Sequence, residues 1–333
     1  MNNSDRPLGA AEPRIRKRPR CGLFLSMHRR FFGSAACLLV LLATLRAQTS
    51  PWPFPPKSAT PAPAKSSVSS ISTAFWNIRW FPGGRPNAYL AEENRQIRSV
   101  HQDIAKLNVD IIGLAEVRDF QSAKLAVKPL PGFKVDVCSN FPAREGQHET
   151  QQVAIVSRLE PMSAWYELWK PARAMTPPRG FAFAAYQIAP KQLLLVYALH
   201  LKSNRGETVE NIAIREESLR QLVEHMRAMQ QAYGSMGSLS WIVGGDFNTA
   251  PDDPRFKAEK TITSLTSAGF RWSWENIPIA NRITLPPDQR FPAACFDHIY
   301  YRGLKLRKAE VINTAAKSSD HRAVRAELAL PQG

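Results

Sequence analysis

The stretch Ser240-Trp241-Ile242-Val243-Gly244-Gly245-Asp246-Phe247-Asn248 passes from an apolar run into two polar side chains. The apolar residues predict a strand over 240–247. Because they are nearly continuous rather than alternating, both faces of that strand are expected to be buried. Asp246 and Asn248 then lie where the strand gives way to a loop. A carboxylate beside a buried strand is costly unless it is hydrogen-bonded or paired with a cation, so the stretch predicts a site as well as a strand.

Other apolar runs lie on both sides of this one in the sequence. They predict strands at 71–78, 109–117, 152–157, 181–188, 192–200, 296–301 and 323–330. Apolar residues also recur at helical spacing, once between Ile97 and Leu107 and once between Ile212 and Met229. Strands that alternate with helices, followed by a strand-rich second half, predict two sheets packed together with helices outside.

The N-terminal part differs in composition from the rest of the chain. Residues 31–45 are uncharged and follow Arg29-Arg30, which predicts a signal peptide or an uncleaved signal anchor over 1–47, with Met27 as an alternative start. Residues 48–70 contain six prolines and predict a linker. Residues 71–333 then form one catalytic domain. The protein is expected to be exported, periplasmic or secreted, or tethered to the membrane if the anchor is not cleaved.

Charge and cysteine content limit the expected partners and bonds. Residues 1–47 carry +7 of the formal net charge of +16, which leaves +9 for the remainder. This charge favours polyanionic partners such as nucleic acid or an anionic membrane surface, and the alternative is a solvated basic surface. No protein partner is implied, and a monomer is expected. Cys138 and Cys295 are expected to be buried thiols, with a single disulfide as the alternative.

Several oxygen-bearing side chains are predicted at or just past the ends of apolar runs: Asn77, Glu116, Asp246, Asn248 and Asp320. Carboxylate and amide oxygens are the ligands that hard divalent cations such as Mg²⁺ prefer. Such a cation supplies the positive charge that hydrolysis of an anionic phosphodiester needs. One such residue alone would be better explained as a turn or helix cap. Five in comparable positions favour a metal site.

Two histidines occur in the same setting. His200 ends the run at 192–200, and His321 follows Asp320. An imidazole, with an ordinary pKa of about 6.5, can take a proton from water or give one to a leaving oxygen at neutral pH. A carboxylate behind each ring would fix its tautomer, and Glu149 and Asp297 are the candidates.

Taken together, the motifs resemble the endonuclease/exonuclease/phosphatase superfamily, and most of all its deoxyribonuclease I-like branch. The resemblance rests, in the family's order, on Phe75-Trp76-Asn77-Ile78-Arg79-Trp80-Phe81, Leu114-Ala115-Glu116-Val117-Arg118-Asp119, Gly244-Gly245-Asp246-Phe247-Asn248, Phe296-Asp297-His298-Ile299 and Ser319-Asp320-His321. It implies an α/β fold, a four-layer sandwich of two mostly antiparallel sheets flanked by helices. It also implies Mg²⁺ or Mn²⁺, with Ca²⁺ as a further ion, and hydrolysis by activated water without a covalent intermediate.

The resemblance assigns a role to each matching residue. Metal ligands are Glu116, Asn77 and Asp320, while Asp246 and Asn248 orient the water and the scissile phosphate. His321 with Asp297 resembles the general base, and His200 with Glu149 resembles the pair that protonates the leaving oxygen. The predicted substrate contacts are Arg118, Arg179, Lys202 and Asn204.

Two departures from the family pattern refine the expected function. Ala115 stands where a Gln commonly precedes the family's Glu, and Leu199-His200 replaces the Pro-Asn of abasic-site endonucleases, which argues against DNA repair. The expected function is therefore a metal-dependent endonuclease acting on nucleic acid, most of all DNA. A sphingomyelinase-like or inositol-phosphate phosphodiesterase of the same fold is the alternative, for which Trp165–Trp169 is the one stretch suited to entering a bilayer. A non-catalytic binding module is less favoured.

Overall fold

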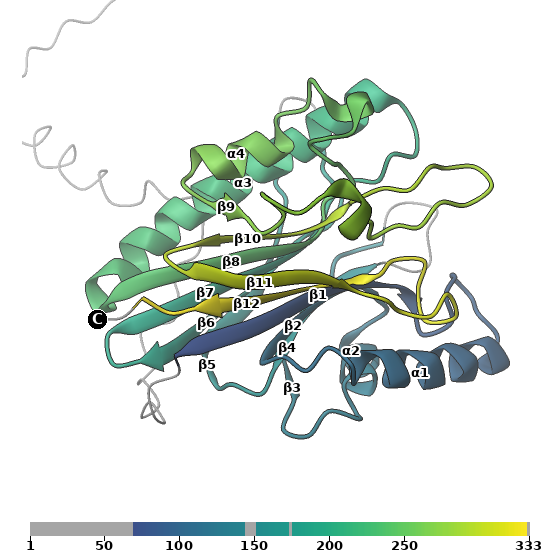
Figure 1. The fold of residues 1–333 in the computed structure, drawn as a ribbon, viewed down its shortest axis with the longest axis horizontal. Helices are drawn as coiled ribbons and strands as arrows, with labels where there is room; N and C mark the ends of the chain where they lie inside the picture. The colour runs from purple at the N-terminus through teal and green to yellow at the C-terminus, as the bar shows by residue number, and fades with distance from the viewer. Residues whose placement is uncertain (1–68, 144–150, 173–174, 332–333) are drawn as a thin grey trace, which may run out of the picture. The chain divides into compact units, whose positions relative to one another are not determined.

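The computed structural model describes residues 69–143, 151–172 and 175–331, which contain two six-stranded sheets (Figure 1). The first sheet, called here the β1 sheet, has the order β11 (Lys305–Ile312), β12 (Ala323–Ala329), β1 (Ser70–Phe81), β2 (Ile111–Val117), β4 (Gln152–Ser157) and β3 (Lys134–Cys138). The second, the β8 sheet, has the order β5 (Pro161–Leu168), β6 (Gly180–Ala189), β7 (Gln192–His200), β8 (Ser238–Asp246), β10 (Asp297–Arg302) and β9 (Arg271–Trp272). Only the pairs β1–β2 and β7–β8 are parallel within these sheets.

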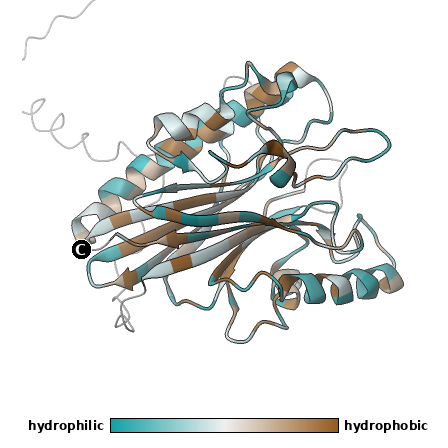
Figure 2. Cartoon of the chain, in the orientation of Figure 1, coloured by the Kyte–Doolittle hydropathy of each residue, from teal (hydrophilic) through white to brown (hydrophobic). Residues whose placement is uncertain are grey.

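The strands and helices form four layers around three apolar clusters. One cluster lies between the sheets. A second joins the β1 sheet to α1 (Leu90–Ile104) and α2 (Phe120–Ala126), and a third joins the β8 sheet to α3 (Thr208–Tyr233) and α4 (Thr261–Ser267). Figure 2 shows hydrophobic residues along the strands and hydrophilic ones alternating along α1. The predicted four-layer sandwich of mostly antiparallel sheets is confirmed.

Phe75 of β1 fixes how closely the two sheets approach. Its ring is buried against Gly113 of β2 and Gly244 of β8. A Cβ atom on Gly113 would lie 2.2 Å from this ring, and one on Gly244 would lie 2.3 Å from it. Interiors are packed at crystal-like density, so even one added methyl group would force the sheets apart. The glycine before the Gly245-Asp246 turn is therefore required by packing.

All eight predicted strands are present, and four further ones were missed. The missed strands are β3, β5, β9 and β11, and each lies at an edge of its sheet. Edge strands carry more exposed and polar residues than central ones, as in Lys305–Ile312 of β11, where no position is fully buried. Long apolar runs in the sequence therefore identify the central strands, whereas the edge strands have no such run and are missed. The predicted helical patterns fall in α1 and α3, although Leu107 lies beyond the end of α1.

Candidate active site

The two parallel strand pairs end at one edge of the sandwich. His200, the last residue of β7, is paired with Asp246, the last residue of β8. Asp246 is also opposite Asp297, the first residue of β10. Gly245 makes this turn possible, because its φ of +138° is rarely adopted by L side chains and a Cβ there would lie 2.1 Å from the Leu199 carbonyl oxygen. Glu116 at the end of β2 and Asn248 after β8 also have positive φ angles, of 62° and 54°.

Asn77 joins two carboxylates at this edge. Its Nδ2 donates to Glu116 Oε1 and to Asp246 Oδ2, each at 3.0 Å, and its Oδ1 accepts from the Arg79 amide at 3.0 Å. The two carboxylate oxygens are each 3.0 Å from one nitrogen and so are no more than 6 Å apart. Asn77 was predicted to be a metal ligand through its oxygen. In this structure the amide nitrogen faces the carboxylates instead, and the ligand role stays a prediction.

His321 and Asp297 form a buried dyad beside these carboxylates. His321 Nδ1 is 2.8 Å from Asp297 Oδ2, and its Nε2 is 3.8 Å from Asp246 Oδ2. Three further bonds hold the backbone of His321: its amide donates to Ser319 Oγ, and its carbonyl accepts from Trp76 Nε1 and Thr314 Oγ1, all at 3.0 Å. The second Asp297 oxygen is buried and has no partner among the described residues.

Charge and burial act in opposite directions on His321. Burial alone would lower the pKa of the imidazole, but the charges of Asp297 and Asp246 raise it to about 10. The same burial raises the pKa of Asp246 and of Glu116. The buried carboxylates of Asp246 and Asp297, with the partly buried one of Glu116, form an environment that favours either protonation or a bound cation.

His200 lies close to both Glu116 and Asp246. Its Nε2 lies 3.7 Å from Glu116 Oε1 and 3.6 Å from Asp246 Oδ2. Burial lowers its pKa well below the ordinary value, and the charges of Arg179 and His321 lower it further. Its buried Nδ1 has no partner among the described residues. Glu149, the predicted partner of this ring, lies outside the described residues.

The acidic cluster fits a hard divalent cation. Asp246, Asp297 and His321 offer ligand atoms within 4.8 Å of one another, and Glu116 shares the Asn77 amide with Asp246. The 2.8 Å bond already explains why Asp297 and His321 are close, so Glu116 and Asp246 are the better ligand candidates. Asp320 is the remaining predicted ligand. Its side chain is 48% exposed, and its Oδ2 lies 3.6 Å from Arg79 Nε.

Asn248 and the predicted substrate contacts lie around this centre with different surroundings. Asn248 donates its amide to Asp246 Oδ1 at 2.9 Å and its Nδ2 to the Leu201 carbonyl. Arg179 donates to the carbonyls of His200 and Leu201, so it holds the turn that follows His200. Lys202 bonds to carbonyls of its own loop, and Asn204 bonds to the Asn248 carbonyl.

Arg118 is placed less directly for a substrate contact. It pairs with Glu93 of α1 and donates to the Pro82 carbonyl at 2.9 Å. Its side chain is 35% exposed. A role in binding substrate would require this ion pair to open or to be shared.

Sequence reasoning missed a set of supporting residues behind the site. Gln96 of α1 donates from Nε2 to the carbonyls of Ile78, Arg79 and Ser318, each at 2.9 Å, and so ties the end of β1 to the loop before His321. Arg215 of α3 makes a two-armed ion pair with Glu259 and also bonds to the loop after His200. The one sequence signal for these roles is that Gln96 and Arg215 each place a polar side chain on an otherwise apolar face of a helix.

Residues interpreted as structural are buried or bonded within the fold. His298 bonds to the Thr249 carbonyl at 2.8 Å and accepts from Trp272 Nε1, so it supports the turn after β8. Cys138 and Cys295 are free thiols, and burial raises the pKa of Cys138 to about 12. The alternative of a disulfide between them is not realised in this structure.

Comparison with known proteins places this site in a family. The model of the endonuclease/exonuclease/phosphatase family matches residues 74–321. The chain therefore belongs to the endonuclease/exonuclease/phosphatase family, whose members are phosphodiester hydrolases that use divalent metals. The predicted family and enzyme class are confirmed. A comparison with curated proteins gave no match.

Solved structures share the fold at low sequence identity. An endonuclease/exonuclease/phosphatase from Beutenbergia cavernae is 16% identical with a TM-score of 0.58, covering 79% of this chain and 72% of its own. The human Nocturnin catalytic domain with bound sulfate is 15% identical with a TM-score of 0.58, covering 80% and 97%. Danio rerio TDP2 complexed with a single-strand DNA product is 16% identical with a TM-score of 0.56, covering 78% and 99%. At these identities the likeness concerns the fold alone.

Proposed function

We propose that this protein is an exported, divalent-metal-dependent nuclease that hydrolyses DNA phosphodiester bonds with deoxyribonuclease I-like specificity. The observation that carries the proposal is the His321–Asp297 dyad. The Nε2 atom of His321 lies 3.8 Å from Asp246, which also lies close to His200 and shares the Asn77 amide with Glu116. The net charge of +9 outside the N-terminal segment supports a polyanionic substrate. The TDP2 relative with a bound DNA product supports nucleic acid as the substrate class.

His321 is the proposed general base. Asp297 fixes the ring with Nδ1 as the donor, so Nε2 is left to accept a proton from water. A neutral ring requires that the negative charge around it be compensated, and Mg²⁺ or Mn²⁺ held by Glu116 and Asp246 would compensate it while polarising the phosphate. Asp246 also holds the Asn248 amide in place at 2.9 Å. Asn248 then orients the phosphate.

His200 is proposed to act on the leaving oxygen. Its low pKa makes the ring neutral at pH 7, so it acts first as a hydrogen-bond donor through one nitrogen. A carboxylate at the unpartnered Nδ1 would raise its pKa towards that of a proton donor. β4 runs antiparallel to β2, so its first residue, Gln152, lies at the edge where β2 ends, three positions after Glu149 in the sequence. That topology supports Glu149 as the missing partner.

The alternative of a membrane-active lipid phosphodiesterase has less support. The one stretch suited to entering a bilayer, Trp165–Trp169, lies largely in the edge strand β5, and its two tryptophans pack against the β8 sheet cluster. Among the described residues, no helix combines the length and apolarity needed to cross a membrane. The export signal at 1–47 and the linker at 48–70 remain proposals, which fractionation and N-terminal sequencing of the mature protein would test.

The test is a substrate panel with matched variants. We expect nicking of plasmid DNA with Mg²⁺ or Mn²⁺ that EDTA abolishes, and weaker turnover of RNA, sphingomyelin and inositol phosphates. His321→Ala and Glu116→Gln should each lower DNA turnover at least about 100-fold. Glu275→Gln, the same change at an exposed glutamate on the surface, should leave turnover unchanged. Equal turnover by Glu116→Gln and the wild type would refute the mechanism, and preferential turnover of sphingomyelin would refute the substrate.

A further inference from the structure

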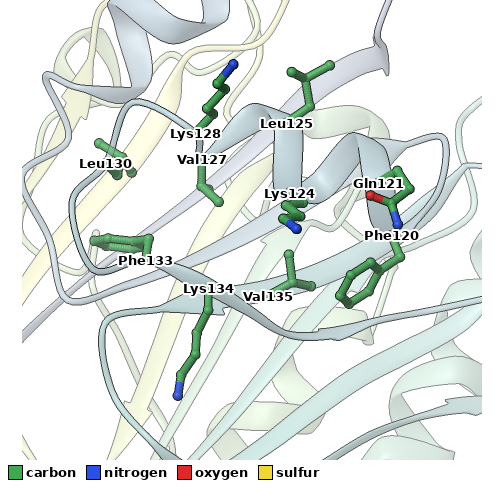
Figure 3. A pocket seen from close by; sticks show the side chains of 10 residues that line it. All are labelled: Phe120, Gln121, Lys124, Leu125, Val127, Lys128, Leu130, Phe133, Lys134 and Val135. Carbon is green, nitrogen blue, oxygen red and sulfur yellow. The ribbon is translucent and has the colours of Figure 1, made fainter.

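A cavity of about 710 Å³ lies between α2 and the edge strand β3, apart from the catalytic cluster (Figure 3). Ten residues between Phe120 and Val135 line it, and none of them belongs to the predicted active site. Its volume falls within the range of small-molecule sites. The proposed nuclease mechanism gives this cavity no role.

The interior of the cavity is mainly aliphatic. Its walls include Leu125, Val127, Leu130 and Val135, together with the rings of Phe120 and Phe133. In Figure 3 the two rings lie on opposite sides of the view, with Val127 and Val135 between them. Phe120 is 49% exposed, an unusual position for a large apolar side chain. These walls suit a hydrocarbon chain.

Three lysine side chains also line this cavity. The lining includes Lys124, Lys128 and Lys134 but no aspartate or glutamate. Lys134 is paired with Glu160, whereas Lys124 in the last turn of α2 and Lys128 just beyond that helix form no ion pair with any residue in the described ranges. Figure 3 shows Lys128 and Lys134 extending to opposite sides of the view and the Lys124 amine at its centre. The cavity therefore combines an apolar wall with two uncompensated positive charges.

The arrangement of rings argues against a nucleic-acid strand as the occupant. Single-stranded nucleic acids bind to grooves in which successive aromatic side chains stack on successive bases. The Arg158 guanidinium already covers the ring of Phe133, at 5.4 Å from its centroid, which leaves Phe120 as the single exposed ring of the lining. One exposed ring with aliphatic walls fits a chain of methylene groups better than a row of bases.

We propose that this cavity binds a long-chain anionic amphiphile, with its hydrocarbon chain against Val127, Leu130 and Val135 and its acidic head group at Lys124 and Lys128. The apolar wall removes the chain from water, and the two ammonium groups neutralise the head. The proposal is independent of the nuclease function. It requires no residue of the catalytic rim.

Calorimetric titration of the purified protein with dodecanoate, below the concentration at which it aggregates, tests the proposal. We expect one saturable site, weakened at least about tenfold in Lys124→Gln/Lys128→Gln. Lys257→Gln/Lys260→Gln removes the same charge from exposed lysines on the other side of the sandwich and should bind like the wild type. A dodecyl trimethylammonium probe, with the same chain and the opposite charge, should bind at least about tenfold more weakly than dodecanoate.

Three results would overturn the proposal. These are no saturable binding of dodecanoate, equal binding by the Lys124→Gln/Lys128→Gln and wild-type proteins, and equal binding of the cationic probe. Competition by a single-stranded oligonucleotide, lost in the same variant, would assign the cavity to nucleic acid instead. Val135→Phe provides a second test, because it fills the cavity from β3 without changing charge and should also weaken binding.

Discussion

Removal of Arg215 should destabilise the protein far more than removal of an exposed arginine on the same helix. Arg215 and Glu259 are fully buried, and their two bonds measure 2.7 and 2.6 Å. Arg215→Met leaves the Glu259 carboxylate buried without a countercharge, at a cost of about 3–5 kcal/mol. Arg227→Met is the matched control. Because Arg227 is an exposed residue of the same helix, its loss should cost under about 1 kcal/mol.

The double variant Arg215→Met/Glu259→Met separates the ion pair from the other bonds of Arg215. Apolar side chains of similar volume replace a buried ion pair at little or no cost. The bonds from Arg215 to the Lys202 carbonyl, at 3.1 Å, and to Asn204, at 2.9 Å, remain lost, at roughly 1 kcal/mol each. The double variant should therefore be destabilised by about 1–3 kcal/mol, less than the single variant.

Urea unfolding at pH 7 measures these differences as shifts in the midpoint at constant slope. A double variant as unstable as Arg215→Met would refute the argument, since it would mean that the unpaired carboxylate is not what destabilises the single variant. Nuclease turnover provides a second readout. Asn204 also bonds to the Asn248 carbonyl at 2.8 Å, so both variants should lose turnover even where stability recovers.

Two further changes have directions set by the structure. Gln96→Leu removes the bond that connects the Ser318 carbonyl to the end of β1, so it should lower kcat more than it changes KM and should lower the free energy of unfolding by about 1–3 kcal/mol. Asn94→Leu, on the exposed face of α1, should change neither kcat nor stability. Equal kcat values for the two variants would contradict this reasoning. Burial raises the pKa of Asp136, beside Tyr186, from 3.8 to about 6. The contribution of this carboxyl group to stability is therefore fully present below about pH 4 and is lost as the pH rises through 6. Asp136→Asn lacks this titration, so its free energy of unfolding relative to the wild type should be about 2–3 kcal/mol higher at pH 7 than at pH 4, as measured by urea unfolding. Parallel pH profiles for the two proteins would contradict the assignment.

The sequence predicted those site residues that interrupt or end apolar runs. Asp246 and His200 each end a continuous run, so a strand and a polar terminus were visible together. The support behind them was not visible in this way. Arg215 and Glu259 are 44 positions apart, and nothing local pairs them. From the sequence, Gln96 is one more polar residue of an amphipathic helix. Its role depends on the bond to the Ser318 carbonyl, which only the structure shows.

The orientation of Asn77 shows a second limit of sequence reasoning. A carboxamide can bind a cation through oxygen or bridge two carboxylates through nitrogen, and its residue type is the same in both cases. Here the Arg79 amide occupies the oxygen, which turns the nitrogen towards Glu116 and Asp246. That choice depends on the bulge that shifts the register of β1 after Asn77. No spacing rule in the sequence marks the bulge.

The position of the active site follows from strand direction. Parallel neighbours end at the same edge of a sheet, so the residues that end β1, β2, β7 and β8 converge. A strand antiparallel to one of these must begin at that edge. β10 begins at Asp297 opposite Asp246, β12 begins just after His321 and pairs with β1, and β6 begins just after Arg179 and pairs with β7. Hydrolytic side chains therefore lie after the parallel strands and before the antiparallel ones. One site can thus draw on residues separated by more than 200 positions.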